Sequence, residues 1–137
     1  MSAEQRARRR PARPAPVIVA PPEAPHLAAL RRWEAVRADP SLDDHARALA
    51  LSEIFRDYVE ATLSFAARAL STTEILRHLE QLTFLPRENL PRAKRLLRAT
   101  DRVKYADDQP GTDLFEELDS DLRAFVESTR PKSWDAR

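Results

Sequence analysis

The amino-acid sequence predicts an all-α protein, a compact bundle of about five helices preceded by a disordered N-terminal segment. Only one of the 137 residues is glycine, whereas hairpin turns and glycine-rich phosphate-binding loops need glycine at fixed positions. Alanine, leucine, arginine and glutamate, which are strong helix formers, dominate the composition. Apolar residues also recur at helical spacing in five segments of the chain.

The length predicts one helical domain, residues 26–131, between an N-terminal arm (1–25) and a tail (132–137). A chain of 137 residues can bury a single core. The absence of cysteine excludes disulfides, thiolate catalysis and cysteine-ligated metal sites. No apolar run approaches the roughly 20 residues that span a membrane. The lack of cysteine is compatible with a reducing compartment, and we expect a cytoplasmic protein.

The arm combines prolines with a cluster of basic residues. Its six prolines remove backbone donors and favour extended conformations, which predicts disorder. Such an arm could contact anionic lipid headgroups at the inner face of the cytoplasmic membrane, or nucleic acid. A solubilising segment without a partner is the alternative. The basic residues are Arg6, Arg8, Arg9, Arg10 and Arg13.

The first helix is expected from His26 to Ala38, because apolar residues recur at helical spacing until Asp39-Pro40 ends the pattern. Trp33 lies on this apolar stripe and is predicted to anchor the core. The stripe consists of Leu27, Leu30, Trp33 and Val36.

The second and longest helix is expected from Asp43 to about Ala67. Asp43 or Asp44 can cap its N-terminus and interact favourably with the helix dipole. Tyr58 lies at the edge of the apolar stripe, so we expect its hydroxyl to face water. The stripe consists of Leu51, Ile54, Phe55, Tyr58, Val59 and Thr62.

A third helix, Thr72 to about Leu82, has clear start signals. Ser71 and Glu74 have the spacing of a capping box, and Leu70 and Ile75 that of a hydrophobic staple. Capping explains why polar residues occur at the start of this helix, so no catalytic role needs to be assigned to them. The residues predicted to face the core are Ile75, Leu76 and Leu79.

A fourth helix should start near Asn89 or Leu90, with Pro91 in its first turn, where the missing N–H costs nothing. It is expected to run to about Asp101. The following residues 102–106 alternate between polar and apolar, which predicts an extended connector or a short edge strand. The residues of this helix predicted to face inward are Leu90, Ala93, Leu96 and Leu97.

The last helix should start at Thr112, which can cap it, and end before Pro131. In the tail, Trp134 either packs back or is exposed, and the pattern does not distinguish the two. The apolar residues of this helix are Leu114, Phe115, Leu118, Leu122, Phe125 and Val126.

No catalytic, cofactor or metal site is predicted, and we expect the protein not to be an enzyme. His26, His45 and His78 do not have the spacing that places two metal ligands on one helix face. The paired carboxylates after residue 106 lack the glycine and glutamate that a calcium-binding loop needs in register. Serine and threonine cluster at helix starts, where capping explains them.

Charge is the remaining signal. The fourth helix carries a basic face and the last helix an acidic one. Three interpretations remain open: the two faces pair with each other or are merely solvated, the basic face binds a protein, or it binds nucleic acid as in a winged helix–turn–helix. A face of almost only arginine and lysine, near an acidic helix, speaks against base recognition. The basic residues are Arg87, Arg92, Lys94, Arg95, Arg98, Arg102 and Lys104.

Four motifs occur in an order that resembles one known family. They are Leu51–Glu60 (LSEIFRDYVE), Ser71–Leu76 (STTEIL), Asp101–Ala106 (DRVKYA) and Ala124–Pro131 (AFVESTRP). The family is the cytoplasmic tail of bacterial membrane proteins encoded beside MoxR-type AAA+ ATPases and von Willebrand factor A-domain proteins, related to the aerotolerance operon proteins. The resemblance covers about residues 22–131.

The resemblance implies a non-enzymatic adaptor or scaffold that works with an AAA+ ATPase, a von Willebrand A protein, or both. It carries over no catalytic residue and no cofactor. The sequence departs from the family in lacking a membrane span, so we expect either a soluble relative or an excised tail. In an excised tail, the arginines at 6–13 would flank the lost helix on its cytoplasmic side.

Overall fold

Five α-helices and one short 3-10 helix form the part of the chain described by the computed structural model, residues 23–106 and 112–131. No strand occurs in these ranges, so the predicted all-α bundle is confirmed. The arginines of the arm and Trp134 lie outside the described residues. The elements are α2 (Pro25–Ala38), α3 (Asp44–Leu63), η1 (Ala67–Ala69), α4 (Thr72–Glu80), α5 (Asn89–Ala106) and α6 (Thr112–Thr129).

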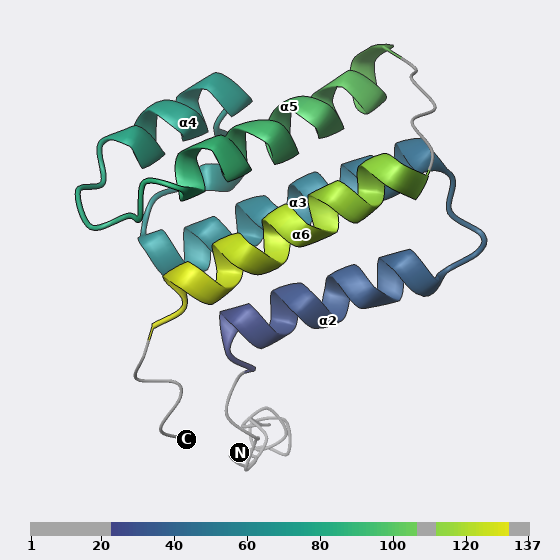
Figure 1. Ribbon diagram of the computed structural model, residues 1–137, viewed down its shortest axis with the longest axis horizontal. Coiled ribbons are helices and arrows are strands. Elements are labelled where there is room, and N and C mark those ends of the chain that lie inside the picture. The colour runs from purple at the N-terminus through teal and green to yellow at the C-terminus, as the bar shows by residue number, and fades with distance from the viewer. Residues whose placement is uncertain (1–22, 107–111, 132–137) are drawn as a thin grey trace, which may run out of the picture.

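Four of the helices, α2, α3, α5 and α6, lie side by side, and α4 packs on the outside against α5 (Figure 1). The core lies between the four long helices, each of which contributes fully buried side chains. Phe55 of α3 meets Phe125 of α6 edge-to-face, with ring centroids 4.9 Å apart. Trp33, predicted as a core anchor, is fully buried on α2.

The local start signals act as the sequence predicts. Asp43 caps α3 by accepting a 2.8 Å hydrogen bond from the Ala46 N–H. Ser71 and Glu74 form both halves of the capping box of α4, and α5 begins at Asn89. These signals depend on neighbouring residues only, which is why sequence locates them well.

The second predicted helix is too long at its C-terminal end, because α3 stops at Leu63 rather than near Ala67. Ser64 has the left-handed backbone conformation (φ 65°) that ends a helix. The guanidinium of Arg56 then binds the carbonyl oxygens of Ala67 and Leu70. A side chain from α3 thus holds the connection to α4.

The predicted extended segment 102–106 is wrong, because α5 continues as helix to Ala106. Val103 is 2% exposed and extends the buried stripe of α5. Lys104 forms an ion pair with Asp101 one turn earlier, at 3.6 Å. Alternation over so few residues also fits a helix that buries one side chain per turn, so packing against the core decides between the two.

Tyr58 is also buried more deeply than its place at the edge of the stripe predicts, with 2% of the residue exposed. Its hydroxyl lies 2.8 Å from the Thr129 hydroxyl and donates to the Val126 carbonyl oxygen at 3.2 Å, both on α6. Burial raises the pKa of Tyr58 above its usual value. The hydroxyl therefore joins α3 to α6 rather than facing water.

We expect the substitution Ser71→Ala to lower the free energy of unfolding by about 1 kcal/mol, the usual value of an N-cap hydroxyl. The Ser71 hydroxyl accepts from the Glu74 N–H at 3.2 Å, and this bond would be lost. Urea unfolding followed by circular dichroism measures the change. Ser71→Asp, which restores an acceptor, is the control, and equal unfolding of all three proteins would contradict the capping role.

Candidate functional site

The structure distributes the seven predicted basic residues over α5 and the turn before it. Arg87 lies on that turn, and the other six lie on α5. Arg92 and Lys104 are half-buried, whereas the remaining five are exposed. The predicted basic face is therefore present as a surface, but its members differ in their partners.

Three of the seven are engaged within the molecule. Arg95 forms a bidentate pair with the buried carboxylate of Asp121 on α6, with N–O distances of 3.0 and 2.7 Å. These hydrogen bonds raise the pKa of the Arg95 guanidinium. Lys104 pairs with Asp101, and Arg92 donates to the Asn89 side chain at 3.0 Å. The interpretation that the two helices pair with each other is thus correct for Arg95.

Three others form what we call the basic stripe: Lys94, Arg98 and Arg102. They lie four residues apart, so successive residues of the stripe are separated by about 6 Å of helical rise on the same side of α5. None of the three forms an ion pair with another described residue. All three side chains are exposed, and no ion pair between residues that the structure describes uses their charges.

Two grooves flank the stripe. The α4–α5 groove has a volume of about 480 Å³ and is lined by Thr73, Leu76, Arg77, Glu80, Leu90, Pro91, Lys94 and Arg98. The α5–α6 groove has a volume of about 300 Å³, and its walls include Ala99, Leu114, Glu117 and Leu118. Lys94 and Arg98 line both grooves and thus form the ridge between them.

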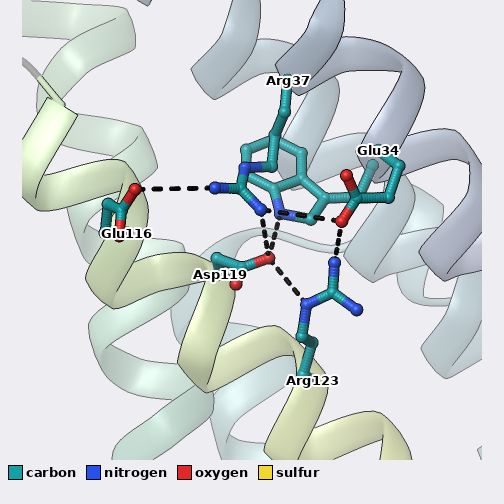
Figure 2. A network of polar contacts seen from close by, with 6 residues as sticks. Glu34, Arg37, Glu116, Asp119 and Arg123 are labelled. Carbon is teal, nitrogen blue, oxygen red and sulfur yellow. Dashed lines mark hydrogen bonds and ion pairs between the residues drawn. The ribbon is translucent and has the colours of Figure 1, made fainter.

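Most acidic residues of the face predicted for the last helix form ion pairs with arginines of the chain. Asp121 holds Arg95, and Asp119 lies in a cluster between α2 and α6. Figure 2 shows Arg37 reaching from α2 to Glu116 and Asp119, while Arg123 binds Asp119 and Glu34. These contacts fasten α2 to α6 and leave Glu117 beside the basic stripe.

The apolar residues that line the α4–α5 groove had been predicted from the sequence to belong to the core. Leu76 and Leu90 were predicted to face inward, but both are only half-buried and line the α4–α5 groove. Ile75 and Leu79, one residue before and three after Leu76, are fully buried and hold α4 against α5. The sequence offers no signal for this, because Leu76 and Leu90 both fit the apolar stripe of their own helix.

In residues 23–106 and 112–131, no three histidine, aspartate or glutamate side chains lie together as a metal site would require. No helix in these ranges has the length and apolar character needed to cross a membrane. Comparison with protein-family models, curated proteins and solved structures finds no match to the chain. The resemblance to the cytoplasmic tail family therefore stays a prediction.

Proposed function

We propose that this chain is a non-enzymatic adaptor that binds a protein partner through the basic stripe of α5. The observation that carries the proposal is that Lys94 and Arg98 are exposed, form no ion pair with another described residue, and line two grooves at once. Cations left unpaired on a grooved surface can complement the carboxylates of a partner, which favours specificity and rapid association.

A protein partner fits this surface better than nucleic acid does. Phosphate-backbone binding depends on a broad positive field, yet Glu80 lies in one groove and Glu117 in the other. Arg95 is already neutralised by Asp121. The segment 102–106, which would have supplied a wing, is helical.

The resemblance of the four motifs supports an AAA+ ATPase of the MoxR type, a von Willebrand A protein, or both as the partner. We place the protein in the cytoplasm, where the arginines of the arm could bring it to the inner face of the membrane. The genes that flank the coding sequence are the first test, since the proposal expects these two partners among their products.

For the binding test, the purified full chain is titrated with those products, and we expect the double variant K94E/R98E to weaken binding by about tenfold or more, equivalent to ~1.4 kcal/mol. The control R31E/R68E changes the net charge equally at exposed arginines of α2 and η1, whose surface ion pairs contribute little to stability. The control should bind normally. Equal binding by all three proteins would refute the proposal. Salt-sensitive binding of duplex DNA that K94E/R98E abolishes would establish nucleic acid instead.

A further inference from the structure

The α4–α5 groove has chemically different ends because its two helices run antiparallel. The Thr72 hydroxyl, at the start of α4, donates to the Asp101 carboxylate near the end of α5 at 2.6 Å. The first turn of α4 is thereby placed toward Arg98, and the end of α4, with Glu80, toward Leu90 and Pro91. Arg98 therefore lies toward one end of the groove, and the carboxylate of Glu80 lies at the other.

Apolar side chains line the groove between these ends. Leu76 on α4 and Leu90 on α5 are half-buried and remain partly open to water. Both leucines pack against the hydrophobic core, to which the fully buried Ile75 and Leu79 of α4 belong. A partner that placed an apolar side chain here would remove this surface from water, which favours association.

Basic side chains stand on both walls of the groove. Arg77 is exposed on α4, opposite Lys94 and Arg98 on α5. None of these three forms an ion pair with another described residue, and among the described residues that line the groove Glu80 is the single acidic one. The described residues that line the groove thus carry three positive charges and one negative charge, which favours an acidic ligand.

We propose that the α4–α5 groove binds an acidic amphipathic helix of the protein partner. Its apolar face contacts Leu76 and Leu90, and its carboxylates pair with the basic residues of the walls. The four-residue spacing of Lys94 and Arg98 matches carboxylates one turn apart on a helix laid along α5. The inference rests on the proposed function and names the partner segment that the surface recognises.

The test uses the ¹⁵N-labelled full chain and a designed helical peptide with leucines on one face and glutamates beside them. We expect amide shifts to change at Thr73, Leu76, Arg77, Lys94 and Arg98. Replacing the peptide's glutamates by glutamine should weaken binding by about tenfold. Polyglutamate, which lacks the apolar face, should bind equally weakly. If polyglutamate binds as tightly as the leucine peptide, or the shifts lie on the α5–α6 groove, the proposal is overturned.

Thr73→Trp provides an independent check, because Thr73 is exposed and a bulky side chain there would fill the groove without touching the core. We expect this variant to keep its unfolding midpoint and lose peptide binding. The control R102E changes a stripe residue that lines the α5–α6 groove and not the α4–α5 groove. This variant should bind the peptide within about twofold of the unaltered chain.

If K94E/R98E abolishes binding of the protein partner but Thr73→Trp does not, the adaptor function stands and the groove assignment fails. If neither variant affects the partner, the adaptor function itself fails.

Discussion

Replacing Trp33 by alanine should lower the free energy of unfolding by about 3–5 kcal/mol, the usual cost of removing a large buried aromatic side chain. Trp33 is fully buried on α2, and its ring centroid lies 6.4 Å from that of Phe115 on α6. Its indole N–H also donates to Asp119 at 2.9 Å. For a domain whose total stability is typically about 5–15 kcal/mol, this loss is a large fraction of the free energy of unfolding.

The measurement is urea unfolding followed by far-ultraviolet circular dichroism, which does not depend on the tryptophan that is removed. Trp33→Phe separates the two contributions, since it keeps most of the apolar contact and loses the indole hydrogen bond. We expect it to cost about 1–2 kcal/mol, as for a lost hydrogen bond and a smaller ring. A cost below about 1 kcal/mol for Trp33→Ala would show that α2 is not packed into the core.

Replacing Asn89 by alanine is expected to cost about 2 kcal/mol, because it removes a fully buried polar side chain that is hydrogen-bonded to two other side chains. The Asn89 amide donates to the Ser128 hydroxyl at 2.8 Å, and its carbonyl oxygen accepts from Ser128 and Arg92 at 3.0 Å. The side chain therefore joins the start of α5 to the end of α6. Its loss leaves two donors without this acceptor.

A double-mutant cycle with Ser128→Ala tests the assignment. If the two side chains act as one unit, the double variant is less destabilised than the sum of the single variants, with a coupling of about 0.5–3 kcal/mol. Thermal and urea unfolding of the four proteins provide the values. Strict additivity would mean that Asn89 stabilises α5 locally, as a helix start, and not through α6.

Much of the fold could be predicted because it depends on short-range chemistry. The capping box of Ser71 and Glu74, the cap at Asp43 and the start of α5 at Asn89 all involve residues within one helical turn. The burial of Trp33 follows from helical periodicity.

The candidate site was predictable in composition but not in detail. The basic residues of α5 stand out by charge alone, yet sequence does not show that Arg95 is paired with Asp121 26 residues later. Nor does it show that Leu76 and Leu90 form a groove wall, because both fit the apolar stripe of their own helix. Periodicity tells which side of a helix is apolar, but a neighbouring helix decides how much of that side is covered.

By itself, the sequence determined the helical class, the number of helices and most of their starts, since these follow from propensity, capping and spacing along the chain. Only the tertiary structure decided that residues 102–106 are helical, that the Tyr58 hydroxyl bonds to α6, and which cations face solvent. The physical reason is the same in each case. Burial of Val103, hydrogen bonding of Tyr58 and neutralisation of Arg95 depend on partners brought close by packing, and short-range patterns contain no information about them.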